Sequence, residues 1–332
     1  MTGTVRWVST LLVLTCVAAA CSNSDAHQPQ TELSTAPAQP AVSAEPGVPP
    51  GTTLTAWSGS FRLSEGSTKM QTVEGRQCAV YDGVDVDFGD SGDYIYVDVP
   101  CAVFRNSRFR TDGAVSNTSA LIQQAQENQL LIIEQSDFDG GPLHQRGVQA
   151  DYANLIVRRS RFTRFGNAGV EFDNSSANAD LEVVDSYLEE TSGWNPDDHV
   201  DGIQVGAGRN VTIRNNTVLV PSFGDDRKDT SYVSNSALGI WAELGDVTGT
   251  VSIQHNVLGG GGVVIYLEQK APYTFGGAVT VTDNVIVTRY SEHGGIWGVL
   301  SPNGLPANLQ WSANVFDDGG GAISLTAATA NG

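Results

Sequence analysis

A short phrase of apolar and polar positions recurs along most of the chain: apolar-x-apolar-x-x, then Ser or Asn, then x-apolar. It occupies residues 103–109, 132–138 and 156–162 and continues to residues 309–316. Its Ser or Asn positions, here called the markers, are Ser107, Ser136, Ser160, Ser186, Asn216, Asn256, Asn284 and Asn314. Successive markers lie 24 to 40 residues apart, without helical periodicity. A variable period with short strand-like phrases predicts a β-solenoid.

A second phrase, Gly-apolar-x-apolar, lies between successive markers. It begins at Gly147, Gly169, Gly202, Gly239, Gly262 and Gly295. Each winding therefore contains at least two strands. Over about residues 75–326 this pattern resembles the right-handed parallel β-helix proteins of the pectate-lyase-like superfamily. The resemblance implies an all-β, single-stranded right-handed parallel β-helix, and that superfamily includes lyases, hydrolases, epimerases, tailspikes and adhesins, so the fold alone does not assign the function.

The markers are predicted to be structural. Residues at one position of successive windings stack about 4.8 Å apart. Stacked Asn side chains would form hydrogen bonds along the solenoid axis, and we expect the Asn markers to adopt the left-handed turn conformation.

The N-terminal sequence is typical of a targeting segment. Arg6 precedes an apolar run at residues 7–17, and the sequence Ala-Ala-Ala-Cys ends at Cys21. This resembles the lipobox of bacterial lipoproteins and implies removal of residues 1–20 and lipid attachment to Cys21; an ordinary secretory signal is the alternative. Six prolines among Ser, Ala and Gln predict a tether over residues 21–52, before a β-helix domain at residues 53–332. We expect a monomer, lipid-anchored at the outer face of a bacterial envelope.

Two cysteines remain after export. Cys16 leaves with the signal peptide, and Cys21 carries the lipid. Cys78 and Cys101 are left as one pair in an exported protein. We predict a disulfide between them that cross-links the first folded segment.

The net charge limits the classes of molecule that the protein is expected to bind. The formal net charge is −19, which excludes nucleic acid as a partner and disfavours a polyanionic glycan without a cation or a local basic patch. An acidic run contains Asp82, Asp85, Asp87, Asp90 and Asp93. Solvated charge at a sheet edge is the preferred interpretation of this run, with a Ca²⁺ site as the alternative.

The second phrase predicts an outward column on one sheet. Strand alternation places Gln149, Glu171, Gln204, Trp241, Val264 and Trp297 in it, with Glu243 and Tyr266 two residues further along their strands. Aromatic rings suit the C–H faces of sugars, while amides and carboxylates suit hydroxyl groups. We therefore predict a glycan groove with substrate-binding residues Glu171, Gln204, Trp241, Glu243, Tyr266 and Trp297. Ordinary sheet surface is the alternative.

Two long loops lead into this column on adjacent windings. They span residues 189–201 and 221–237, and they add Trp194 and Arg227 to the predicted substrate-binding set. Asp198 and Asp201 flank His199, which stands three residues before its glycine, as His144 does two windings earlier. An imidazole between carboxylates in such a loop is a candidate catalytic group.

Three functions fit these residues, and a polysaccharide lyase is preferred. In that hypothesis His199 is the base, Asp198 and Asp201 are its acidic neighbours, with Asp201 orienting it, and Lys228 and Arg227 neutralise a uronate carboxylate. Ca²⁺ held by the acid-rich loops could replace these cations, although no ligand set is assigned. The catalytic Arg motif of pectate lyases is not matched.

The second function is glycoside hydrolysis. Asp201-Gly202-Ile203 resembles part of the Asn-Thr-Asp-Gly-Ile motif of polygalacturonases, and Asp225-Asp226 resembles the Asp pair of the next winding. A pair of carboxylates could also come from Asp201, Glu171 or Glu243. The third function is a non-catalytic glycan binder or structural solenoid.

Overall fold

The computed structural model describes residues 45–64, 69–112, 120–142, 145–173, 178–190, 199–221 and 234–329, all within one compact unit, Gln39–Gly332. The predicted signal peptide and Cys21 lie outside the described residues. No helix in the described ranges is long and apolar enough to cross a membrane.

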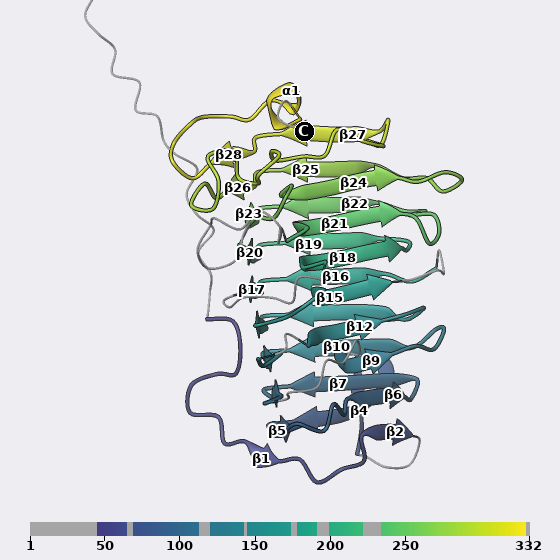
Figure 1. Ribbon diagram of the computed structural model, residues 1–332. Coiled ribbons are helices and arrows are strands. Elements are labelled where there is room, and N and C mark those ends of the chain that lie inside the picture. The colour runs from purple at the N-terminus through teal and green to yellow at the C-terminus, as the bar shows by residue number, and fades with distance from the viewer. Residues whose placement is uncertain are drawn as a thin grey trace, which may run out of the picture. The chain divides into compact units, whose positions relative to one another are not determined.

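The chain winds through three sheets in turn and forms a parallel β-helix (Figure 1). The eight-stranded sheet contains β2 (Arg62–Ser64), β6 (Ile95–Asp98), β9 (Ala120–Gln124), β12 (Arg146–Ala150), β15 (Ala168–Asp173), β18 (Asp201–Ala207), β21 (Ser236–Ala242) and β24 (Ile265–Gln269). The predicted β-solenoid is confirmed. A single short helix, α1 (Leu325–Ala328), lies near the end of the described chain.

Two ten-stranded sheets complete each winding. The β4 sheet contains β3 (Met70–Val73), β4 (Arg76–Asp82), β7 (Cys101–Arg105), β10 (Leu130–Glu134), β13 (Asn154–Arg158), β16 (Leu181–Val184), β19 (Val211–Arg214), β22 (Val251–Gln254), β25 (Val279–Thr282) and β27 (Leu309–Ser312). The β5 sheet contains β1 (Thr55–Ala56), β5 (Val84–Asp87), β8 (Arg108–Arg110), β11 (Asp137–Asp139), β14 (Arg161–Thr163), β17 (Tyr187–Glu189), β20 (Thr217–Val220), β23 (Val257–Gly260), β26 (Val285–Ile286) and β28 (Val315–Phe316). Neighbouring strands are parallel, apart from the antiparallel pair β3–β4.

The markers form a continuous hydrogen-bond ladder at the corner between the β4 and β5 sheets. All eight are buried. The backbone N–H of each marker from Ser107 to Asn284 donates to the side-chain oxygen of the next marker, beginning with Ser107 to Ser136 at 3.2 Å and ending with Asn284 to Asn314 at 3.1 Å. The Asn side chains also bond one another, as in Asn256 Nδ2 to Asn284 Oδ1 at 2.9 Å. The predicted stacking is confirmed.

The left-handed conformation lies one residue earlier than predicted. The residue before each marker has a φ between 47° and 57°; these residues are Asn106, Gln135, Arg159, Asp185, Asn215, His255, Asp283 and Ala313. Turning the chain at this residue directs the marker side chain into the corner, where it reaches the neighbouring winding. The expectation that the Asn markers themselves are left-handed is wrong.

The interior is filled by side chains that repeat with the windings. Phe109, Phe138 and Phe162 are in register on β8, β11 and β14, and their rings stack at centroid distances of 4.7 and 4.6 Å. These separations match the spacing of adjacent strands, so the ring stack follows directly from strand register. The three rings are at most 2% exposed.

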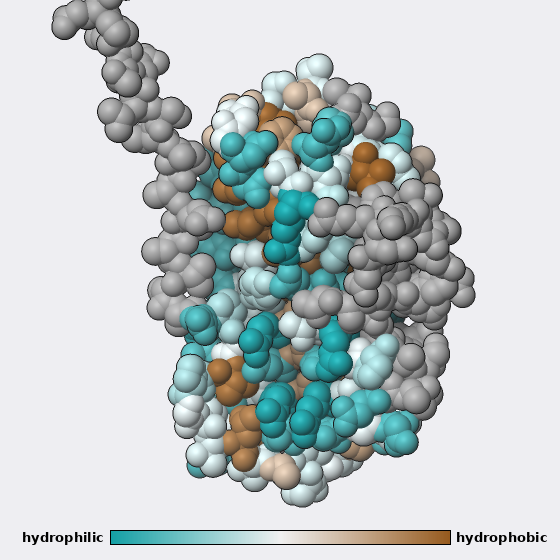
Figure 2. Space-filling model, turned by 60° about the vertical axis from the view of Figure 1, so that its left-hand side comes forward, coloured by the Kyte–Doolittle hydropathy of each residue, from teal (hydrophilic) through white to brown (hydrophobic). Residues whose placement is uncertain are grey.

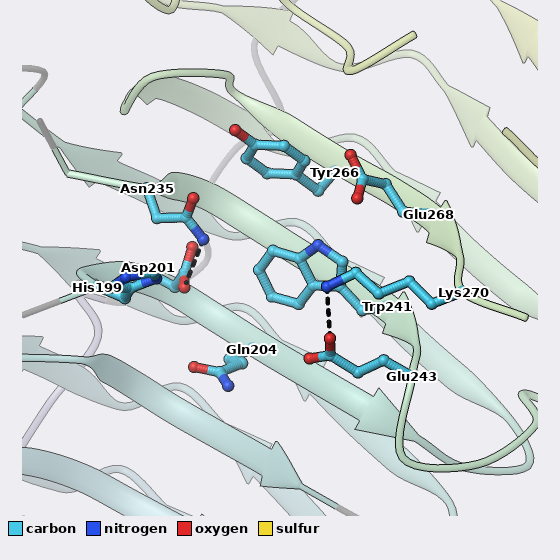
Figure 3. Close-up of a pocket in the computed structure, with 9 residues that line it drawn as sticks. All are labelled: His199, Asp201, Gln204, Asn235, Trp241, Glu243, Tyr266, Glu268 and Lys270. Carbon is cyan, nitrogen blue, oxygen red and sulfur yellow. Dashed lines mark hydrogen bonds and ion pairs between the residues drawn. The ribbon is translucent and has the colours of Figure 1, made fainter. Parts of the chain in front are cut away.

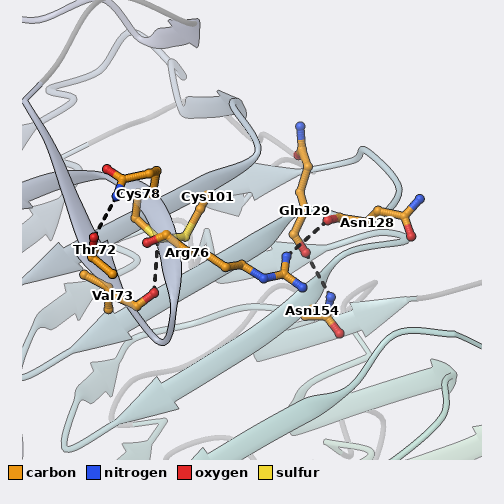
Figure 4. Close-up of a disulfide and its surroundings, with 9 residues drawn as sticks. Thr72, Val73, Arg76, Cys78, Cys101, Asn128, Gln129 and Asn154 are labelled. Atoms are coloured by element: carbon orange, nitrogen blue, oxygen red, sulfur yellow. Dashed lines mark hydrogen bonds between the residues drawn. A yellow bond between two sulfur atoms is a disulfide. The ribbon is translucent and has the colours of Figure 1, made fainter.

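The predicted disulfide is confirmed. Cys78 of β4 is bonded to Cys101 of β7, with both residues buried (Figure 4). Because β4 and β7 are paired strands, the bond links the first two windings of the β4 sheet.

The acidic run is paired with arginines. Asp82, Asp85 and Asp87 form ion pairs with Arg105, Arg108 and Arg110 of the next winding, at 2.6 to 2.8 Å. The Arg108 guanidinium holds the pKa of Asp85 below its ordinary value. The three carboxylates are partly exposed to solvent, as predicted, and each also has a cation one strand away.

A segment assigned to the tether by the sequence lies along the solenoid. The N–H of Gly47 donates to the carbonyl of Arg159 at 2.8 Å, and β1 pairs with β5 further down the β5 sheet. Hydrophilic residues gather over the lower windings of the face shown in Figure 2. The chain thus runs beside a polar sheet face before entering the first winding.

The ladder predicts a large and local dependence of stability on Asn256. Its side chain accepts from the N–H of Asn216 at 2.9 Å and donates to Ile213 at 3.0 Å, so Asn256→Ala leaves buried polar groups without partners. We expect the free energy of unfolding in urea to fall by about 3 kcal/mol. The exposed Asn303, changed to Ala, serves as the control. A loss below about 0.5 kcal/mol for Asn256→Ala would contradict the role of the ladder.

Candidate functional site

The outward column of the eight-stranded sheet agrees with the sequence in the middle windings. Gln149, Glu171 and Gln204 are in register on β12, β15 and β18. On β21 and β24 the same positions hold Gly239 and Tyr266.

The sequence placed Trp241 and Val264 in this column, and both placements are wrong by two residues. Trp241 pairs with Glu268, and Val264 is fully buried. The cause is that the Gly-apolar-x-apolar phrases of β18 and β21 are not in register. Gly239 of β21 pairs with Gln204, two residues after the glycine of β18, Gly202.

The indole of Trp241 nevertheless returns to the column. A Cβ atom at Gly239 would lie 1.8 Å from Cη2 of Trp241, so the ring fills the space that a side chain at Gly239 would occupy. The ring centroid of Tyr266 is 5.5 Å away, and Nζ of Lys270 lies 5.9 Å from the indole centroid. Trp241 is only 7% exposed as a result.

A cleft of about 450 Å³ opens over these strands. Six predicted site residues line it: His199, Asp201, Gln204, Trp241, Glu243 and Tyr266. Three further residues line the cleft but were not in the predicted site set: Asn235, Glu268 and Lys270. His199, Asp201 and Asn235 lie together at one end, while the Glu243–Lys270 ion pair and Glu268 lie at the other (Figure 3).

The remaining predicted residues are of two kinds: some lie outside the described residues, and two described ones do not line the cleft. Trp194, Asp198, Arg227 and Lys228, together with His144, lie outside the described residues. Trp297 follows β26 and packs on Gly262, away from the predicted column. Glu171 is buried beside the cleft rather than lining it.

Asp201 is a buried carboxyl group with two side-chain hydrogen bonds. It is 1% exposed, its Oδ2 accepts from Asn235 Nδ2 at 3.1 Å, and its Oδ1 accepts from the hydroxyl of Ser236. Burial raises the pKa of Asp201 to about 8, with a smaller contribution from the negative charge of Glu171. Asp201 is therefore mostly uncharged at neutral pH.

His199 is exposed and is held by Asn167 through the backbone. The N–H of His199 donates to Asn167 Oδ1 at 3.2 Å, and the N–H of Asp201 donates to the Asn167 carbonyl at 2.6 Å. No hydrogen bond or ion pair connects the side chains of the described residues His199 and Asp201. Asn167, rather than Asp201, fixes this short segment beside the cleft.

Glu171 is paired with Arg146. Arg146 Nε lies 2.9 Å from Glu171 Oε2, and Nη1 lies 3.2 Å from Oε1. Burial raises the pKa of Glu171 to about 7, although Arg146 opposes the shift. Burial, with the charges of Asp151 and Glu243, raises the pKa of Asp173 to about 6. A row of proton-binding carboxylates thus adjoins the cleft.

The neighbours of Asp201 on the next winding are polar but not acidic. Asp201 pairs with Ser236, and Asn235 precedes it. Asp225 and Asp226, which the sequence offered as the carboxylate pair of a hydrolase, lie outside the described residues. Among the described residues, no group of three or more His, Cys, Asp or Glu side chains is arranged to bind a metal ion.

Comparison of the chain with protein-family models, with curated proteins and with solved structures finds no match. The described residues that line the cleft supply an exposed imidazole, a buried carboxyl group, two amides and two aromatic rings, with carboxylates at the far end.

The raised pKa of Asp201 predicts how stability changes with pH. A carboxyl group whose folded pKa, about 8, exceeds its ordinary value of 3.8 stabilises the fold fully below the ordinary value and loses this contribution as the pH rises through 8. We expect the melting temperature to fall between about pH 5 and about pH 9, and to fall less in Asp201→Asn. Differential scanning calorimetry measures both, with the exposed Asp318→Asn as control. Equal pH dependence in Asp201→Asn and the wild type would contradict the assignment.

Proposed function

We propose that the protein is a polysaccharide lyase that cleaves a uronate-containing glycan by β-elimination in this cleft. One observation carries the proposal: the buried carboxyl group of Asp201 lies at the same end of the cleft as the exposed imidazole of His199, bonded to Asn235 and Ser236. A base next to uncharged hydrogen-bonding groups suits proton abstraction beside a carboxylate.

The reaction breaks two bonds and forms a double bond. A base removes the proton from the carbon that carries the carboxylate, and the electron pair passes onto the carboxyl group. The bond between the adjacent carbon and the glycosidic oxygen then breaks, a carbon–carbon double bond forms, and the departing oxygen takes a proton. In this proposal His199 removes the first proton. Burial raises the pKa of Tyr266 to about 12, so its phenol stays protonated and can supply the second.

Asp201 and Asn235 would stabilise the charge that builds on the uronate carboxyl group. An uncharged carboxylic acid in a buried site can donate a hydrogen bond to such an anion, and so can an amide. The sequence assigned this role to Arg227 and Lys228, which lie outside the described residues. Lys270, a cation that lines the cleft, is bound to Glu243. The lyase hypothesis therefore relies on uncharged hydrogen-bond donors, Asp201 and Asn235, at the His199 end of the cleft. It does not need an unpaired cation there.

The cellular setting is part of the same proposal. The resemblance of the repeats to the pectate-lyase-like superfamily supports a glycan substrate. The lipobox-like sequence ending at Cys21 supports export and lipid anchoring at a bacterial envelope, where extracellular polysaccharides are accessible.

Glycoside hydrolysis is the second candidate, because a protonated Asp201 is also a proton donor. Hydrolysis needs a second carboxylate at a suitable separation across the glycosidic bond. The adjoining positions, Asn235 and the first residue of β21, Ser236, carry no carboxylate, which favours the lyase.

The lyase predicts a product with a carbon–carbon double bond. We expect ultraviolet absorbance to rise when the full-length protein is mixed with one of a panel of polymers: pectate, alginate, glycosaminoglycans and bacterial exopolysaccharides, each with Ca²⁺ and with chelator. His199→Ala should lower the rate at least about 100-fold, because proton abstraction is lost. His255→Asn, far from the cleft, is the matched control. Flat traces on every uronate polymer would contradict the lyase.

Asp201 variants separate the two chemistries. In the lyase, Asp201→Asn keeps an uncharged donor, so turnover should stay within about tenfold of the wild type and should no longer decline above about pH 8. In a hydrolase the amide cannot supply a proton, and turnover should be abolished. Asp201→Ala should inactivate either enzyme. Rate profiles against pH for the wild type and both variants distinguish these outcomes.

A further inference from the structure

Trp297 is a large apolar side chain that is exposed to solvent in the folded protein. It is 49% exposed, whereas Trp241 in the cleft is 7% exposed. It lies between β26 and Leu300, which forms a single parallel bridge with Ile265 of β24. An indole exposed to this degree presents a flat apolar face and a hydrogen-bonding edge to a ligand.

A chain of hydrogen bonds connects Trp297 to Asp201. Asn235 Nδ2 donates to Asp201 at 3.1 Å, the N–H of Gly262 donates to the Asn235 carbonyl at 3.0 Å, and the N–H of Trp297 donates to the Gly262 carbonyl at 2.7 Å. Each bond crosses to the next winding. Trp297 is therefore held at a fixed position relative to the His199 end of the cleft.

The indole rests on a glycine, as Trp241 does. A Cβ atom at Gly262 would lie 2.5 Å from Cζ3 and 2.8 Å from Cε3 of Trp297, so a side chain there would displace the ring. Over Gly239 the equivalent ring of Trp241 is covered by Tyr266 and Lys270. Over Gly262 the ring keeps about half of its surface open.

The position suits a sugar unit of the same glycan. Gly262 lies two windings above Asp201, which places the Trp297 ring about 10 Å along the solenoid axis. A short oligosaccharide spans this distance, and the C–H face of a sugar ring packs well on an exposed aromatic ring.

We propose that Trp297 binds a sugar unit two windings away from the reacting unit, so that the polysaccharide runs along the solenoid axis past the N-terminal ends of β18, β21 and β24. The identity of the polymer rests on the proposed function; the platform itself rests on the geometry of Trp297. The sequence grouped Trp297 with Trp241 in one column. In the structure the Trp297 ring lies over Gly262, before β24, whereas the Trp241 ring lies over Gly239 within β21.

Affinity electrophoresis tests the platform without turnover. The His199→Ala protein is run through gels that contain pectate, alginate, a glycosaminoglycan or a bacterial exopolysaccharide. We expect at least one polymer to retard it, and Trp297→Ala in this background to weaken the apparent affinity about 5- to 10-fold. Trp297→Phe should restore part of the loss. Met70→Ala, which removes an equally exposed apolar side chain on β3, should match the parent.

Two results would overturn the inference. One is equal retardation of the parent and Trp297→Ala in every gel; the other is no retardation of the parent by any polymer. Retardation that depends on Trp297, together with no unsaturated product from the wild type, supports the platform and contradicts the lyase. With an active polymer, Trp297→Ala should raise KM for long substrates, leave kcat unchanged and leave the shortest cleaved oligomers unaffected.

Discussion

The hydrogen bond from each corner N–H to the marker side chain of the next winding is the constraint on which the rest of the structure depends. It satisfies buried polar groups at the corner where successive windings turn from the β4 sheet into the β5 sheet. It also fixes the height of each winding relative to its neighbours, so strands far apart in the sequence stay in register. The ring stack of the core and the Asp–Arg pairs of the β5 sheet follow from this register, as does the placement of Asp201 beside Asn235 and Ser236.

The cleft combines this rigidity with an unusual electrostatic environment. Asp151, Glu171, Asp173, Asp201 and Glu243 influence one another's charge on or beside the eight-stranded sheet, and Arg146 and Lys270 pair with Glu171 and Glu243. Burial raises the pKa values of Asp201, Glu171 and Asp173, so these carboxyl groups bind protons at a higher pH than ordinary carboxylates do. An uncharged Asp201 changes the chemistry available at the cleft: it can donate a hydrogen bond where an ionised carboxylate would repel an anionic sugar.

The fold was predictable because its signal is repeated. Eight markers and the apolar residues beside them identify one strand pair per winding without knowledge of the loops. The site was less predictable, since its geometry depends on register between windings whose loops differ in length. Aligning Gly239 with Gly202 displaced Trp241 by two residues and concealed Asn235, whose relation to Asp201 appears only when Ser236 is placed opposite Asp201. The left-handed residue before each marker has no common side chain, ranging from Asn to Arg and Ala, so composition alone could not locate it.

The central claim is that Asp201 is uncharged in the folded protein at neutral pH. Infrared difference spectroscopy of the wild type against Asp201→Asn tests it directly, because a protonated carboxyl group and a carboxylate absorb at separate frequencies. We expect a protonated-carboxyl band at neutral pH that is absent from Asp201→Asn and disappears as the pH rises through about 8. A carboxylate band for Asp201 at neutral pH, with no protonated band, would contradict it.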